Sequence, residues 1–251
     1  MTQKKDIKRR LAAFCLAAFL SVSLLSATVG AAEGRGFDFP SDAAPVHVTL
    51  DGETVLAEEA MILRSVTYVP LRHFAELIGA DSIDWDAKNS TATVQKGSTQ
   101  LAVRDGAYVI VASGRYLYTG ERIENFNGRL FVPIRPLAKA FCVELAWDGA
   151  SRTVILNSTD GVLESGSSFY DSNDLYWLSR IISAEASGES LYGQIAVGNV
   201  VMNRVASRQY PNTIYGVIFD RVGGVQFSPV AMGTIYRAPT ASAITAAKIC
   251  L

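Results

Sequence analysis

The chain has 251 residues, of which 49% are apolar, with 23 Lys and Arg, 24 Asp and Glu, two His and three Cys. This is the composition of a globular protein, so the disordered, collagen-like and coiled-coil classes are excluded. Two histidines and three cysteines are too few for a zinc site with several such ligands or for a disulfide framework. Neither a metal nor a cofactor is therefore expected.

Residues 1–32 have the pattern of a secretory signal peptide. A basic start from Lys4 to Arg10 precedes an uncharged apolar segment at 11–25, and small residues follow it. This order predicts export, with cleavage after Ala31 or Ala32. The stretch 11–32 is also long enough to span a bilayer, so an uncleaved anchor remains the alternative. Contact with a membrane is expected only through this segment.

The charges divide the rest of the chain into two parts. Residues 33–174 contain 12 basic and 20 acidic residues, whereas residues 175–251 contain six basic and three acidic ones. This asymmetry predicts two modules with different roles. An exported chain without a basic cluster in its mature part is not expected to bind nucleic acid.

An internal repeat defines the first module. YVPLR at 68–72, followed by HFAELIGADSIDWDAKNSTATV, recurs as FVPIR at 131–135, followed by PLAKAFCVELAWDGASRTVIL. Each copy is expected to form a strand, a helix that starts at the proline, and a hairpin with a turn after Trp-Asp. The alternating segments upstream, VHVTLDGETVL and AYVIVASGRYLY, are expected to be strands as well.

This duplicated pattern resembles the copper amine oxidase N-terminal-like domain, or stalk domain, over residues 46–157. The resemblance implies a wall-facing spacer or binding domain, but not a copper site, because His47 and His73 cannot form one between them. Trp85 and Trp147 could stack on sugars, yet their equivalent positions favour a repeated core anchor. Cys142, between them, is expected to be a small buried residue.

A helix that begins at Leu175 carries the main catalytic candidate, after a polar linker at 158–174. Leu175, Leu178 and Ile182 share one face, and Glu185 is the next residue on it. A carboxylate on an apolar face is costly unless paired, and burial would raise its pKa. A glycosidase uses such a protonated carboxyl as its general acid.

Two other interpretations of the same glutamate remain open. As a residue near a helix end, Glu185 could turn outward to solvent, or Arg180 or Arg204 could neutralise it. Either would account for a glutamate at this position without requiring a catalytic role.

Several separated motifs follow in the second half. They are SAEASGE at 183–189, GQIAVGNVVMNRV at 193–205, YPNTI at 210–214, GVI at 216–218, QFSPV at 226–230 and GTIY at 233–236. Over 175–251 they resemble the SleB/CwlJ family of bacterial cell-wall hydrolases, whose best-known members degrade spore cortex. The resemblance implies cleavage of the muramic acid–N-acetylglucosamine bond of peptidoglycan glycan strands, with Glu185 as the catalytic acid. The predicted fold class is α+β, with a duplicated small α/β stalk domain followed by a mostly helical lysozyme/transglycosylase-like catalytic domain.

The number of carboxylates bears on the mechanism. After Asp174 only Glu185, Glu189 and Asp220 remain, so the usual glycosidase pair is hard to assemble. A scheme with one acid fits better: the muramic acid 6-hydroxyl attacks C1, and the product is a 1,6-anhydro sugar. Glu189 is interpreted as a helix-start or supporting residue. Asp220 as a second carboxylate would indicate hydrolysis instead.

Four further residues are candidates for substrate binding. Asn203 interrupts a helix expected at 191–206, which is apolar almost all round; it either holds the core together or orients substrate. Gln226 could bind an N-acetyl group, and Phe227 and Tyr236 could stack on sugar rings. Alternatively, Phe227 is a core residue and Gln226 forms hydrogen bonds only within its own loop. The last expected helix, after Pro239-Thr240, lacks a closing cap, which suggests a truncated hydrolase domain.

The leading interpretation is an exported, wall-localised enzyme that cleaves peptidoglycan. A non-catalytic wall-binding protein is the alternative from another class. An amidase or peptidase is disfavoured by the lack of His and of paired acids in 175–251. The sequence does not predict the oligomeric state or distinguish cortex from vegetative wall.

Overall fold

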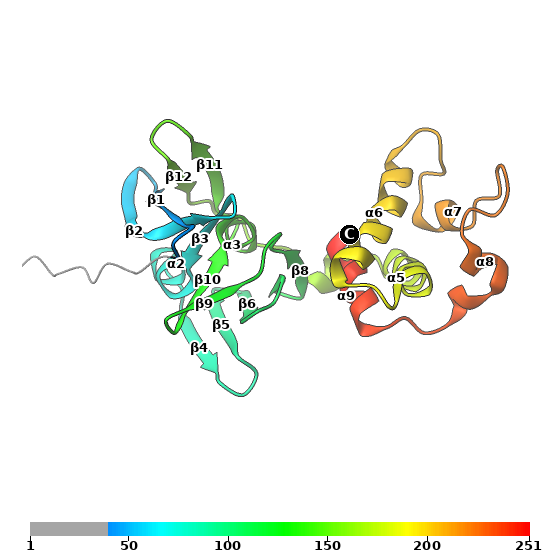
Figure 1. The fold of residues 1–251 in the computed structure, drawn as a ribbon, viewed down its shortest axis with the longest axis horizontal. Coiled ribbons are helices and arrows are strands. Elements are labelled where there is room, and N and C mark those ends of the chain that lie inside the picture. The colour runs from blue at the N-terminus through cyan, green and yellow to red at the C-terminus, as the bar shows by residue number, and fades with distance from the viewer. Residues whose placement is uncertain (1–39) are drawn as a thin grey trace, which may run out of the picture. The chain divides into compact units, whose positions relative to one another are not determined.

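The computed structural model describes residues 40–251, apart from the side chains of Ala57 and Glu58. Strands dominate up to residue 157 and helices dominate after it, so the predicted α+β class is confirmed (Figure 1). Each half has its own hydrophobic cluster, one drawn from residues 46–163 and the other from residues 178–247. The predicted signal peptide lies outside the described residues. Within 40–251, no helix combines the length and the apolar character needed to cross a bilayer.

The strand-rich half contains two sheets. The larger sheet has the order β11-β12-β1-β2-β3-β10-β9, and the smaller has the order β4-β5-β6-β7-β8. The strands of the larger sheet are β1 Ala44–Leu50, β2 Glu53–Leu63, β3 Val66–Pro70, β9 Glu124–Phe126, β10 Arg129–Pro133, β11 Glu144–Asp148 and β12 Thr153–Asn157. Those of the smaller are β4 Ser82–Asp86, β5 Thr91–Lys96, β6 Thr99–Arg104, β7 Val109–Ala112 and β8 Arg115–Tyr118. The helices α2 Leu71–Leu77 and α3 Ile134–Ala140 each follow a strand that ends in proline.

The internal repeat is confirmed as strand, short helix and hairpin in both copies. The hairpins even share a register, because Trp85 pairs with Ala92 and Trp147 with Val154. The copies meet where β3 and β10 pair antiparallel, with Val69 opposite Val132. Those two valines are equivalent in the repeat, and Tyr68 and Phe131 each pair with the other copy's proline. The pairing is therefore that of a local two-fold axis.

Two details of the repeat differ from the expectation. Trp85 and Trp147 are 50% and 42% exposed, so the interpretation as core anchors is wrong. Side chains two residues apart share a strand face, so each indole lies on the same face as a residue that packs on the core, Ile83 or Leu145. It lies two residues farther along the strand, where the core leaves it half-exposed. Cys142 is half-buried rather than buried, and its φ of +52° occupies the left-handed position that Gly79 takes in the first copy.

The segment 158–174 is more ordered than a polar linker. Leu163 is buried in the first core, and a short helix, α4 Gly166–Phe169, follows it. The N–H of Gly166 donates to the carbonyl of Ser113, and the N–H of Tyr116 donates to the hydroxyl of Tyr170. These backbone groups fix the segment against the β7–β8 hairpin.

The second half consists of helices, mostly where the motifs predict them. They are α5 Ser172–Ala186, α6 Leu191–Ala206, α7 Ile214–Ile218, α8 Ser228–Met232 and α9 Ala241–Cys250, with a 3-10 turn at Thr234–Tyr236. The helix expected to begin at Leu175 begins three residues earlier, because Asp171 caps it by accepting from the N–H groups of Asn173 and Asp174. The predicted bounds of α6 are confirmed, but this apolar helix is buried on one face only: Gly198 and Val201 lie on the buried face, whereas Val200 is 47% exposed.

Candidate active site

Helix α5 positions Glu185 in its last turn. Leu178, Ile181 and Ile182 are fully buried and pack α5 against α6, α7 and α9. At the end of the helix, the hydroxyl of Ser183 accepts from the N–H of Thr240, the residue that caps α9. The turn that carries Glu185 is thus held by the core on one side and by the start of α9 on the other.

The side chain of Glu185 is exposed, so the burial expected for it is wrong. The buried face of α5 continues from Leu178 and Ile182 to Ala186, which is 3% exposed. Steps of four residues thus follow the core to the helix end, and Glu185 lies at the border of that face. From Ile182, a step of three residues leads to Glu185 and a step of four leads to Ala186. Both steps are compatible with a helical face, so the sequence alone does not show which residue is buried.

The arginines proposed as neutralising partners do not pair with Glu185. The guanidinium of Arg180 stacks over Tyr176 at 3.5 Å from the ring centroid. That of Arg204 lies about 5 Å from the rings of Tyr210 and Phe227. Within residues 175–251 no ion pair is formed, so the carboxylate of Glu185 has no charged partner there.

An aromatic cluster begins two turns before Glu185 on α5. Trp177 makes edge contacts with Tyr176, Tyr215, Phe219 and Tyr236, at centroid distances of 4.9 to 6.2 Å. The tyrosines of this cluster are 43% to 62% exposed. Eight residues separate Trp177 from Glu185, a rise of about 12 Å along the helix. Of these aromatic residues, the sequence motifs predicted only Tyr236 as a sugar-binding residue. The adjacent Tyr176 and Trp177, on the same helix as Glu185, were the sequence feature that could have indicated the others.

Among the predicted substrate-binding residues, Tyr236 keeps a free surface. Phe227 is 8% exposed and belongs to the second core, so it offers no platform in this structure. The amide of Gln226 donates to the carbonyls of Val222 and Gly224, as a satisfied loop glutamine would. Asn203 is exposed on α6 and does not hold the core together.

The other two carboxylates have local roles. Asp220 accepts from the N–H of Val222 at 2.9 Å and so fixes the start of the loop after α7. Glu189 directly precedes Ser190, the cap of α6, and its carbonyl accepts from the amide of Gln194. Gln194 is 2% exposed, and its own carbonyl oxygen has no partner within the described structure. Residues 40–251 contain no cluster of His, Cys, Asp or Glu that could hold a metal ion.

Two family models match the chain. Residues 49–156 match the copper amine oxidase N-terminal domain, and residues 188–251 match the Cell Wall Hydrolase family. Both resemblances expected from the motifs are confirmed in this way. Glu185 lies three residues before the second matched segment, whereas Glu189 lies inside it.

Several relatives match about 30% of the chain. The spore cortex-lytic enzyme of Bacillus cereus is 40% identical over 74 residues, which are 30% of this chain and 27% of that protein. The enzyme of the same name from Bacillus subtilis is 38% identical over 74 residues, 30% of this chain and 23% of that protein. The chain thus spans about a quarter of the length of these relatives.

Two solved structures each match about a third of the chain. The catalytic domain of the germination-specific lytic transglycosylase SleB from Bacillus anthracis is 38% identical and is matched over 34% of this chain and 65% of that one, with a TM-score of 0.29. The catalytic domain of the Bacillus cereus SleB protein is 40% identical over 31% of this chain and 59% of that one, with a TM-score of 0.28.

Proposed function

We propose that this protein is an exported enzyme that cleaves the glycan strands of peptidoglycan, with Glu185 as its acid and base. One observation carries the proposal: an exposed carboxylate without a charged partner ends the helix whose preceding turns bear an exposed aromatic cluster. The match of residues 188–251 to the Cell Wall Hydrolase family and the similarity to spore cortex-lytic enzymes support the choice of substrate. Export rests on the pattern of residues 1–32.

The aromatic cluster and Glu185 divide the work of binding and chemistry. Sugar rings pack their C–H faces on aromatic rings, and Trp177 with its exposed tyrosines offers such surfaces. A strand bound there would cover Glu185 and displace water from its carboxyl. Removal of water disfavours the charged form of a carboxyl, which leaves it able to donate a proton.

The proposed reaction is a lytic transglycosylation at the muramic acid–N-acetylglucosamine bond. The carboxyl of Glu185 donates its proton to the glycosidic oxygen as the bond to C1 of muramic acid breaks. The resulting carboxylate then accepts the proton of the 6-hydroxyl while that oxygen bonds to C1. Glu185 ends protonated, as it began, and no water is consumed. The internal hydroxyl, held beside C1, replaces a second carboxylate.

The products of digestion test this proposal. The protein is incubated with purified peptidoglycan, and the released fragments are analysed by mass spectrometry. Fragments lighter by one water than hydrolytic products are expected, and Glu185→Gln should abolish them. Glu189→Gln is the matched control: Glu189 is also an exposed glutamate, four residues away, and its replacement should retain cleavage.

Other products would change the assignment. Fragments that end in a reducing muramic acid would mean hydrolysis, and Asp220→Asn would then test the second carboxylate. A protein that pellets with the wall but releases nothing would be a non-catalytic binder, the alternative function.

A further inference from the structure

The first module contains two equivalent pockets that the active-site proposal does not use. The first pocket has a volume of about 400 Å³ and the second about 580 Å³. The first is lined, from one copy of the repeat, by Pro70, Leu71, Arg72, Ile83, Trp85 and Ala92. The second is lined by the same positions of the other copy: Pro133, Ile134, Arg135, Leu145, Trp147 and Val154.

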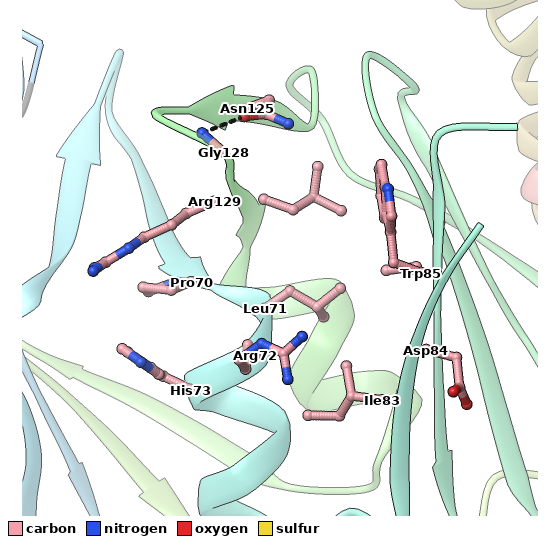
Figure 2. A pocket seen from close by; sticks show the side chains of 12 residues that line it. Pro70, Leu71, Arg72, His73, Ile83, Asp84, Trp85, Asn125, Gly128 and Arg129 are labelled. Atoms are coloured by element: carbon pink, nitrogen blue, oxygen red, sulfur yellow. Dashed lines mark hydrogen bonds between the residues drawn. The ribbon is translucent and has the colours of Figure 1, made fainter. Parts of the chain in front are cut away.

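Each pocket is completed by the other copy of the repeat. The β9–β10 hairpin closes the first pocket, and Figure 2 shows Trp85 on one side of it, Pro70 and Arg129 on the other, and the Asn125–Gly128 turn at one end. The β2–β3 hairpin, at Ser65 and its neighbours, closes the second in the same way. This exchange follows from the two-fold pairing of β3 with β10. The resemblance between the pockets is therefore a property of the fold.

The shared residues point to one class of ligand. Each pocket has a half-exposed indole whose N–H has no hydrogen-bond partner in the described structure. It also has an exposed arginine, Arg72 or Arg135, that forms no ion pair with any described residue. An indole face takes a sugar ring, and a guanidinium takes a carboxylate. Volumes of several hundred cubic ångströms suit a small ligand unit.

The charge of the module supports an anionic ligand. Residues 33–174 carry a net charge of −8, yet the basic side chains outnumber the acidic ones in both pockets. Asp84 is the one carboxylate that lines the first pocket, and none lines the second. An acidic domain that presents arginine beside tryptophan in two places provides local charge complementarity for a carboxylate.

We propose that each pocket binds a carboxylate-bearing sugar of the wall glycan, and that the module thereby holds two separate strands. A glycan strand has a direction, and the two pockets are related by a two-fold axis. Such an axis either reverses the direction of a bound strand or relates it to a second strand beside it. One continuous strand therefore cannot bind to both pockets in the same way. The choice of the wall glycan as ligand rests on the proposed function. The binding itself does not depend on Glu185.

Stoichiometry and bridging test this proposal separately from cleavage. The full chain is used with Glu185→Gln and Trp177→Ala together, so that no strand is degraded or held at the aromatic cluster of the second half. The ligand is glycan strands freed of their peptides, whose muramic acids carry free carboxylates. Titration with a short fragment should give two sites per chain, and long strands should be bridged, which raises light scattering. Trp85→Ala and Trp147→Ala should each leave one site and abolish bridging, and the double variant should leave none.

Matched variants separate binding from folding. Tyr108→Ala removes an aromatic side chain that is 45% exposed and lines neither pocket, so it should keep both sites. Trp85→Phe keeps an aromatic face and should keep its site. Arg72→Gln should weaken the first site about tenfold, because a hydrogen bond to a charged group is lost. It should weaken binding of a neutral glycan of equal length much less.

Several results would overturn the proposal. One site per chain in the parent protein, or bridging that survives the loss of either tryptophan, would refute two equivalent pockets. Loss of binding in Tyr108→Ala would point to a general effect on the fold. Binding of a proline-rich peptide, rather than the glycan, with the same dependence on Trp85 and Trp147 would assign the pockets to a protein partner.

Discussion

Gly198 sets how closely α6 can approach the helices on either side of it. A Cβ at this position would lie 2.5 Å from Sγ of Cys250 on α9 and 2.9 Å from Cδ1 of Ile182 on α5. Ile182 is one turn before Glu185, so Gly198 lies at the junction of the three helices that hold the candidate acid. Gly198→Ala should therefore disturb both the stability and the position of Glu185.

The expected cost is the difference between two opposing effects. Overpacking a core by a methyl group costs about 1–3 kcal/mol. Alanine in a helix interior recovers about 0.8–1.0 kcal/mol relative to glycine. Gly198→Ala should thus lower the free energy of unfolding by about 1 kcal/mol. In a Cys250→Ala background the shorter contact is gone, and the same substitution should become nearly neutral.

A double-mutant cycle, measured by urea unfolding, tests this reasoning. The coupling between Gly198→Ala and Cys250→Ala should be about 1 kcal/mol in the favourable direction. Cys250→Ser retains an atom at the colliding position and should show little coupling. Gly188→Ala, where a Cβ would meet no atom within 4 Å, is the control for glycine replacement itself. A cost for Gly198→Ala that is equal in all three Cys250 backgrounds would refute the overpacking explanation.

Substitutions at three other positions test separate features. Cys142→Gly should raise the melting temperature, because it relieves the left-handed backbone that Gly79 adopts freely in the other copy; an unchanged or lower value would contradict this. The N–H and hydroxyl of Ser158 both donate to Asp51 at 2.8 Å and hold the pKa of this carboxyl below its ordinary 3.8. The ionised Asp51 carboxylate therefore stabilises the folded state above pH 3.8, and this stabilisation is lost as pH falls through the lower folded-state pKa. Asp51→Asn should thus lower the melting temperature at pH 7 but not in strong acid. A decrease in melting temperature that is the same at every pH would refute this explanation. Trp177→Ala should weaken wall binding and cleavage together, whereas Trp177→Phe should restore much of both, and equal activity in all three proteins would remove the aromatic cluster from the site.

The sequence predicted which elements form better than which side chains they expose. Repetition, proline positions and turn signals located both Trp-Asp hairpins and the helices at 191–206 and after Thr240. Exposure was missed for Trp85, Trp147 and Glu185, because periodicity gives the spacing of a face but not the packing partner that covers it. The pockets were missed for a related reason: each combines two copies of the repeat, and their proximity depends on a strand pairing between residues about 60 apart.

The segment 158–174 is a case in which the sequence predicted too little structure. Its polar composition predicted a linker, yet Gly166 approaches Gly114 so closely that a Cβ there would lie 2.3 Å from the carbonyl oxygen of Gly114. A contact of that kind depends on one backbone position in each of two segments. Composition averages over a segment and does not report it.

The pairing of Val69 with Val132 has a consequence for how the first module can change. Its two halves form an isologous contact inside one polypeptide, the arrangement that two identical subunits would adopt in a symmetric dimer. A substitution at this contact changes the packing of both halves at once. A substitution in the β2–β3 or β9–β10 hairpin instead changes the pocket of the other half. A single repeat on its own would leave β3 or β10 as an unpaired edge, and a second copy of itself is the partner that best completes it.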